Sequence, residues 1–155
     1  MSETCTGESI PVVRLALAKE RCARVPALVV DNPKAIAAWI SKSYGCRPQE
    51  NFIAIFFDAR MAIIAVQEIS VGSLDATMMD PRVIFSAALL AGATAMMVAH
   101  NHPSGNPEPS AEDVKLTNHL FEGCKLLGVR LLDHLVIARG GEFTSFLLRR
   151  MGPWV

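Results

Sequence analysis

The sequence lacks an excess of charge of either sign. Among its 155 residues, 15 lysines and arginines balance 15 aspartates and glutamates, and only 19% of the residues are charged. Dedicated nucleic-acid-binding proteins carry surplus basic residues that neutralise phosphates, so this balance disfavours that class. Intrinsic disorder is disfavoured too, because 51% of the residues are hydrophobic and disorder requires low hydrophobicity with high net charge.

The sequence also lacks a membrane span, a secretory signal and paired cysteines. Its least polar stretch, residues 87–99, is shorter than the roughly 20 apolar residues that a spanning helix needs. The first residues have neither the basic nor the apolar region of a signal peptide. The four cysteines are scattered without a CxxC spacing, which disfavours a cysteine zinc site and fits a reducing compartment. We therefore expect a cytoplasmic protein that does not bind membranes.

The pattern of apolar residues and breakers predicts one α/β domain over residues 11–155, preceded by a flexible tail at residues 1–10. Capping residues, helix-initiating prolines and terminal glycines indicate three helices, and short apolar runs indicate a mixed sheet of about six strands. The helices are expected at residues 35–44, 81–91 and 110–128, and the strands at residues 11–24, 51–57, 61–71, 94–100, 129–138 and 142–146.

A cluster of potential metal ligands stands in this otherwise apolar chain. His100 and His102 are two residues apart on a predicted strand, so their side chains point to the same side. A proline-rich loop follows, and Asp113 falls in the first turn of the next helix. Two histidines and one carboxylate leave a fourth zinc position open for water, which is typical of catalytic zinc sites.

Each of these residues has a structural alternative. Ser110 and Asp113 have the spacing of a capping box, in which both side chains only close the helix start. The two histidines can equally be polar loop residues. The metal interpretation is favoured because three candidate ligands fall within 14 residues of a chain that is poor in charge.

A zinc hydrolase also needs a general base in apolar surroundings that tune its pKa. Glu68 is the only acidic residue in the predicted strand at residues 61–71, which makes it the candidate. An exposed strand position without catalytic function explains Glu68 equally well.

These residues carry a family resemblance. Glu68, His100-x-His102-Pro103 and, after six intervening residues, Ser110-x-x-Asp113 resemble the JAMM (MPN+/JAB) metalloprotease motif. The resemblance is closest to the RadC family and covers about residues 12–150. It rests on the segments EISVGSL (68–74), PRV (81–83), AHNHPSG (99–105), PS (109–110) and LDH (132–134).

The resemblance implies a cytidine-deaminase-like JAB1/MPN fold with zinc held by His100, His102 and Asp113. It further implies that Glu68 deprotonates the zinc-bound water and that Ser110 donates a hydrogen bond to the developing oxyanion. The implied reaction is hydrolysis of a peptide or isopeptide bond in a protein or peptide substrate. Family members usually carry an additional N-terminal helix-hairpin-helix-like region, so the chain resembles the isolated catalytic-type domain.

Alternatives from other classes stay open. The family's traditional repair label suggests a DNA-repair-associated accessory protein, although the balanced charge predicts no direct DNA binding. A protein-binding MPN module without turnover is also compatible with the motif. The sequence lacks the G-x-S-x-G segment of serine hydrolases and the H-E-x-x-H motif of zincins. Of the neighbouring Asp133 and His134, at most one can face the site, where a hydrogen bond to a ligand is one role and simple burial another.

Overall fold

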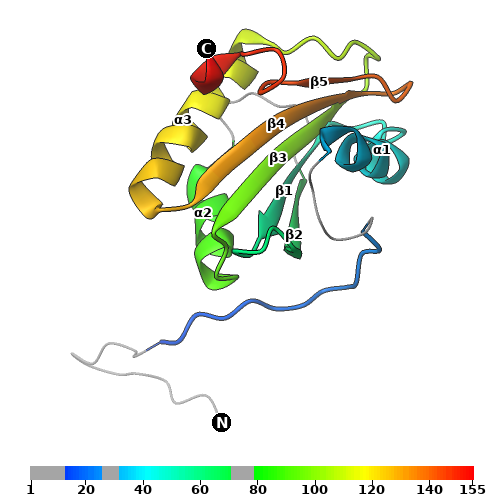
Figure 1. Cartoon of the computed structure of the whole chain (residues 1–155). Coiled ribbons are helices and arrows are strands. Elements are labelled where there is room, and N and C mark those ends of the chain that lie inside the picture. The colour runs from blue at the N-terminus through cyan, green and yellow to red at the C-terminus, as the bar shows by residue number, and fades with distance from the viewer. Residues whose placement is uncertain (1–12, 26–31, 71–78) are drawn as a thin grey trace, which may run out of the picture.

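The structure, a computed structural model, describes residues 13–25, 32–70 and 79–155. Within these ranges one mixed sheet lies between helices on its two faces (Figure 1). The regular elements, in chain order, are α1 (Pro33–Tyr44), β1 (Asn51–Phe57), β2 (Ile63–Ser70), α2 (Pro81–Leu90), β3 (Ala95–His102), α3 (Ala111–Leu127), β4 (Arg130–Ala138), β5 (Phe143–Ser145) and the short 3₁₀ helix η2 (Gly152–Trp154).

The sheet has the strand order β2-β1-β3-β4-β5. β1 runs antiparallel to both β2 and β3, β3 and β4 are parallel, and β5 returns antiparallel to β4. The α3 helix provides the crossover between the two parallel strands, as such a connection requires. The C-terminal end of β3 therefore lies beside the start of β1 and faces the start of α3. Three segments thus meet at the edge of the sheet that is formed by these strand ends.

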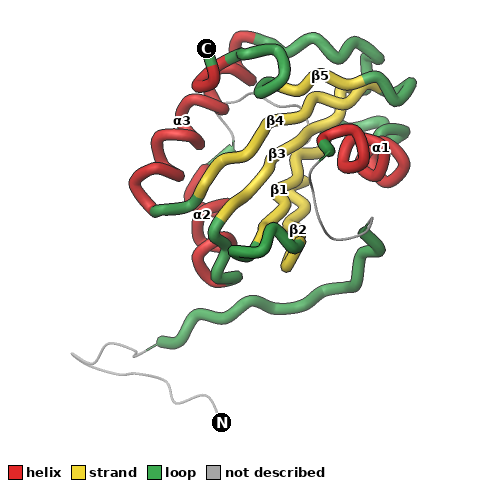
Figure 2. The backbone as a smooth tube through the Cα atoms, viewed as in Figure 1, coloured by secondary structure: helices red, strands yellow, loops and turns green. Residues whose placement is uncertain are grey.

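Two apolar cores form on the two faces of the sheet. One core packs α2 and α3 against the face that carries Phe52, Phe56 and Val98. The other packs α1 against the face that carries Ile53, Ile55 and Ala99. Figure 2 shows the strands in yellow between these helices. The alternation of these residues along β1 and β3 is the period of two that places successive side chains on opposite faces.

The predicted fold class is confirmed, with five strands in the described residues instead of about six. The predicted strand at residues 11–24 is wrong where the structure describes it, because residues 13–25 form no regular element. Val13 and Leu15 are 72% and 73% exposed. Alternation of apolar residues makes a strand only where a neighbouring strand supplies hydrogen bonds and a core covers one face, and this segment has neither.

The predicted tail, residues 1–10, lies outside the described residues. None of the helices in the described ranges combines the length and the hydropathy that a membrane span requires.

Candidate metal centre

The end of β3 carries two histidines side by side on one face of the sheet. His100 Nε2 and His102 Nε2 are 3.0 Å apart. The His100 residue is 1% exposed, whereas 17% of the His102 side chain is exposed. The strand thus presents one fully buried and one partly accessible imidazole, in the same-side arrangement that the spacing predicts.

Asp113 joins the two histidines from the first turn of α3. Its Oδ1 is 3.3 Å from His100 Nε2, and its Oδ2 is 3.7 Å from His102 Nε2. The capping alternative holds as well, because the Ser110 hydroxyl and the Asp113 carboxylate form a reciprocal capping box at the start of α3. Capping fixes the carboxylate beside the imidazoles, so the two interpretations describe one arrangement.

The surroundings of Asp113 favour its charged form. Burial opposes ionisation of this carboxyl, but the hydrogen bond and charge of His100 and the hydrogen bonds from the Ser110 backbone and hydroxyl outweigh it and lower its pKa. Ser110 Nα and Oγ each donate to Asp113 Oδ2 at 2.7 Å. A carboxylate that stays ionised in a largely buried place is suited to binding a cation.

Glu50 is the fourth group at this edge, and sequence reasoning missed it. Its Oε1 lies 3.6 Å from His100 Nε2 and 3.7 Å from His102 Nε2. Glu50 directly precedes β1, whose Phe52 pairs with His100 across the antiparallel ladder. Burial raises the pKa of Glu50, and the charge of Asp113 adds to this, while the two histidines partly offset it. Only the pairing of β1 with β3 could have pointed to Glu50.

Asn101, between the two histidines, faces the opposite side and holds the segment that carries Glu50. Its Oδ1 accepts a hydrogen bond from Asn51 N at 2.7 Å, and its Nδ2 donates to Gln49 O at 3.1 Å. These backbone groups flank Glu50 on both sides. Asn101 is 1% exposed, so its side chain is held by these two hydrogen bonds without competition from water at its own end.

The structure does not bring Glu68 to the histidines. Glu68 and Ala99 both pair with Ile53, whereas His100 pairs with the neighbouring Phe52. Paired residues share a face of the sheet, so Glu68 and His100 lie on opposite faces.

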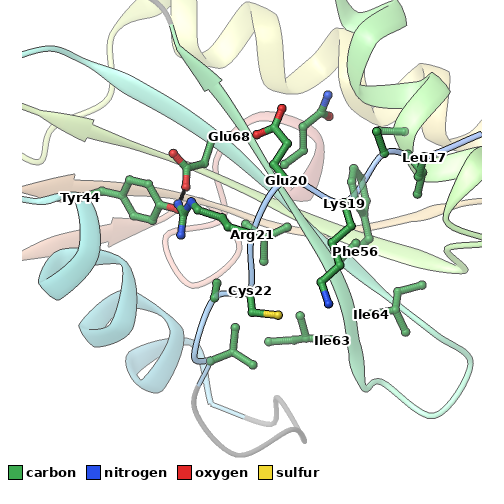
Figure 3. Close-up of a pocket in the computed structure, with 17 residues that line it drawn as sticks. Leu17, Lys19, Glu20, Arg21, Cys22, Tyr44, Phe56, Ile63, Ile64 and Glu68 are labelled. Atoms are coloured by element: carbon green, nitrogen blue, oxygen red, sulfur yellow. Dashed lines mark hydrogen bonds and ion pairs between the residues drawn. The ribbon is translucent and has the colours of Figure 1, made fainter.

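The partners of Glu68 are on the α1 side of the sheet. Its carboxylate accepts a hydrogen bond from Tyr44 Oη at 2.8 Å and forms ion pairs with Arg47 and Arg21. Figure 3 shows Glu68, Tyr44 and Arg21 together in this separate pocket. The geometry therefore does not support Glu68 as the base of the histidine cluster.

His134, on β4, lies behind His100 on the same face as the cluster. Its Nε2 is 2.8 Å from His100 Nδ1, and its Nδ1 is 2.6 Å from Thr117 Oγ1 on α3. Burial lowers the pKa of His134 well below its usual value, and the nearby charge of His100 lowers it further. His134 therefore has the hydrogen-bond role that sequence reasoning left open, while Thr117 gave no sequence signal.

Asp133 has a structural role on the other side of β4. Its carboxylate accepts hydrogen bonds from Ser145 Oγ at 2.5 Å and from the backbone N–H groups of His134 and Leu147 at 2.7 and 3.0 Å. Burial nevertheless raises its pKa. Asp133 thus fixes the turn after β5 to β4 and does not reach the cluster.

The atoms that converge at this edge suit a metal ion. Glu50, His100 and His102 each present a ligand atom within 4.8 Å of the others, and the Asp113 carboxylate lies against the same two imidazoles. His102 Nδ1 is 2.8 Å from the Asn106 carbonyl oxygen, which can only accept, so the Nδ1–H donates, and in the neutral imidazole Nε2 keeps its lone pair for a metal. Imidazole and carboxylate ligands of this kind bind divalent transition metals.

Comparison with known proteins shows the family of the chain. A family model for the RadC-like JAB domain matches residues 30–152. The chain belongs to this family. The matched residues include all four groups of the candidate metal centre and also His134 and Thr117 behind it.

Relatives of the RadC-like JAB domain are UPF0758 proteins from bacteria and archaea. The protein of Trichormus variabilis is 42% identical over 113 residues, which are 73% of this chain and 46% of the relative. The protein of Acaryochloris marina is 41% identical over 133 residues, 84% of this chain and 54% of the relative. The protein of Methanosarcina acetivorans is 37% identical over 129 residues, which are 83% of this chain and 56% of the relative. The chain thus spans about half the length of the curated relatives it matches.

Proposed function

We propose that this chain is a zinc-dependent metallohydrolase that cleaves a peptide or isopeptide bond in a protein substrate. The observation that carries the proposal is the convergence of His100, His102, Asp113 and Glu50 from three segments at one sheet edge. Membership of the RadC-like JAB family supports it, because this family resembles the JAMM metalloproteases.

His100, His102 and Asp113 would hold the zinc ion. Their two Nε2 atoms and one carboxylate are the mixed nitrogen and oxygen ligand set that catalytic zinc sites use. When bound, zinc supplies a Lewis acid that polarises the scissile carbonyl and lowers the pKa of water. The partial exposure of His102 gives a substrate access to this edge of the sheet.

Glu50, in place of Glu68, would act as the general base. Its Oε1 accepts a proton from the attacking water and returns it to the nitrogen of the leaving amine, so the carboxylate is regenerated at the end of the cycle. Its Oε1 lies 3.6 Å from His100 Nε2 and 3.7 Å from His102 Nε2, too far to accept a hydrogen bond from either, so its lone pairs are free to face a substrate. Its raised pKa suits a group that must both take and give a proton.

Ser110 would donate a hydrogen bond to the oxyanion. It is exposed at the start of α3, and its hydroxyl, which here donates to Asp113 Oδ2 at 2.7 Å, would turn its one proton to the oxyanion. A hydroxyl held at a helix N-terminus is well placed to stabilise negative charge that develops next to the metal ligands.

The two glutamates offer a matched test of the proposal. Purified wild-type protein is expected to contain about one zinc per chain by elemental mass spectrometry and to cleave members of a denatured bacterial protein library, read out as new N-termini. Glu50→Gln should keep the zinc and lose at least 10²-fold of the cleavage rate, because the base is gone while the ligands stay. Glu68→Gln should keep both the zinc and the cleavage rate of the wild-type protein.

Three results would contradict the proposal. Wild-type protein free of zinc after metal-supplemented purification would remove the site. Cleavage that survives in Glu50→Gln would place the base elsewhere. Zinc without any cleavage, together with retained proteins in a pull-down, would favour the protein-binding alternative.

A further inference from the structure

A continuous chain of buried hydrogen bonds leads from His100 back to α3. His100 Nδ1 contacts His134 Nε2 at 2.8 Å, and His134 Nδ1 contacts Thr117 Oγ1 at 2.6 Å. Thr117 Oγ1 in turn donates to the Asp113 carbonyl oxygen at 2.6 Å. Thr117 and His134 are both 0% exposed, and His100 is 1% exposed. Water therefore cannot replace any of these partners.

The end of this chain fixes the direction of every hydrogen bond in it. A carbonyl oxygen only accepts, so Thr117 donates its single hydroxyl proton to the Asp113 carbonyl. The Thr117 oxygen must then accept from His134 Nδ1–H. A neutral imidazole carries one proton, so His134 Nε2 accepts, and His100 Nδ1–H donates to it.

The surroundings of His134 are those of a neutral imidazole. Its ring stacks on Phe146 with centroids 4.7 Å apart and meets the edge of Phe52 at 5.6 Å. Among the described residues, its side chain contacts no carboxylate at hydrogen-bond distance. A buried imidazolium without such a partner would be strongly disfavoured.

We propose that His134 and Thr117 are positioning residues that hold His100 in the tautomer whose Nε2 is free to bind the metal. The same chain of contacts orients the His100 ring, because its Nδ1 is tied to β4 and, through Thr117, to α3. The inference rests on the metal site of the proposed function, but it concerns which atom of His100 carries the proton.

The two metal-binding histidines thus reach the same state by different means. His102 donates its Nδ1–H directly to the backbone carbonyl of Asn106. His100 lies deeper, and its Nδ1 reaches the Asp113 carbonyl through two intermediate side chains. Asp113 therefore contributes to the site in two ways: its carboxylate lies against the two imidazoles and would bind the metal, and its backbone oxygen accepts the last hydrogen bond of the chain.

The tautomer can be measured directly in the metal-free, ¹⁵N-labelled protein. Long-range ¹H–¹⁵N correlation spectra distinguish protonated from unprotonated ring nitrogens. We expect a protonated Nδ1 for His100 and His134 and an unprotonated Nε2 for His134, as the direction of the chain requires. An unprotonated His100 Nδ1, or a proton on His134 Nε2, in the wild-type protein would overturn the proposal, and this measurement needs no variant and no activity.

Thr117→Val tests the role of the chain in metal binding. Valine has nearly the shape of threonine but cannot accept from His134 Nδ1–H, so the fixed direction is lost. We expect mixed tautomers at His100 and a zinc dissociation constant that is 10- to 100-fold higher by chelator competition, as for other partners of metal-bound histidines. Thr117→Ser, which restores the hydroxyl, should return the dissociation constant to within about threefold.

Thr144→Val is the matched control, because Thr144 is 5% exposed on β5 but contacts Arg149 and no histidine. It should leave the tautomers and the zinc affinity unchanged. Wild-type zinc affinity and His100 tautomer in Thr117→Val would overturn the proposal. An equal loss in Thr144→Val would assign the effect to general destabilisation and overturn it too. Absence of cleavage by the wild-type protein would contradict the proposed function but would leave these measurements valid.

Discussion

At the scale of single residues, Asn101 illustrates how one side chain can place another. Its amide joins the backbone of Gln49 and Asn51 and so holds Glu50 between them. Asn101→Leu has similar size but leaves the Asn51 N–H without its acceptor, whereas the Gln49 carbonyl keeps the hydrogen bond from Asn51 Nδ2. We expect a loss of about 1–3 kcal/mol in the free energy of unfolding, measured by urea denaturation.

The local effect of Asn101→Leu should appear at the Asn51 amide. Its hydrogen exchange should accelerate more than that of other β1 amides, because it alone loses its acceptor. Asn118→Leu, at an exposed position of α3, should change the free energy of unfolding by no more than about 0.5 kcal/mol and should leave the exchange of the Asn51 amide unchanged. Uniform acceleration along β1 in Asn101→Leu would show global destabilisation without a specific clamp on Glu50.

The residues of the candidate site differed in how far the sequence could predict them. His100, His102 and Asp113 are close in sequence, so local spacing on a strand and a helix start was enough to bring them together. Glu50 lies 50 residues away and reaches them only because β1 pairs antiparallel with β3. Glu68 was the plausible base by composition, but the register of β2 turns it to the α1 face.

At the scale of elements, Gly123 sets how closely α3 approaches α2. A Cβ at this position would lie 2.4 Å from Phe85 Cζ. Alanine is the better helix former by about 1 kcal/mol, yet here its methyl group would collide with the aromatic ring. We expect Gly123→Ala to lower the free energy of unfolding by about 1–3 kcal/mol, the usual cost of overpacking, measured by chemical denaturation.

A double variant identifies the cause of that loss. Phe85→Leu removes the ring, so Gly123→Ala in this background should be neutral or stabilising. Glu122→Ala, on an exposed position of the same helix, should change stability by less than about 0.5 kcal/mol. An equal loss from Gly123→Ala with and without the ring would contradict the packing explanation.

The elements themselves were largely predictable from their ends. Asn32 and Asp80 cap helices that begin with proline, and Gly128 ends α3 in the left-handed conformation with φ of 70°. These signals are local, and so the helices were placed within a few residues. Residues 13–25 show the limit, because a strand depends on a partner that lies elsewhere in the chain and alternation alone cannot supply one.

At the scale of the whole molecule, the balance of charge bears on the DNA-associated alternative. Nonspecific DNA binding comes from lysines and arginines that displace counterions from phosphates, and this chain has no surplus of them. Its basic side chains are partly engaged, since Arg149 forms a bidentate pair with Glu108 and Arg82 pairs with Asp80.

We therefore expect no saturable DNA binding by this chain at physiological salt. In fluorescence anisotropy with a 20-base-pair duplex at about 150 mM salt, the dissociation constant should exceed about 10⁻⁴ M, the weak limit of ordinary nonspecific binders. Any residual signal should disappear as salt is raised, because only counterion release could drive it. Binding near 10⁻⁶ M that persists with rising salt would instead require contacts beyond phosphate neutralisation. Since the chain spans about half the length of its relatives, the measurement assigns this property to the JAB domain alone. A DNA-associated role of longer relatives would then have to reside outside the domain that carries the candidate metal centre.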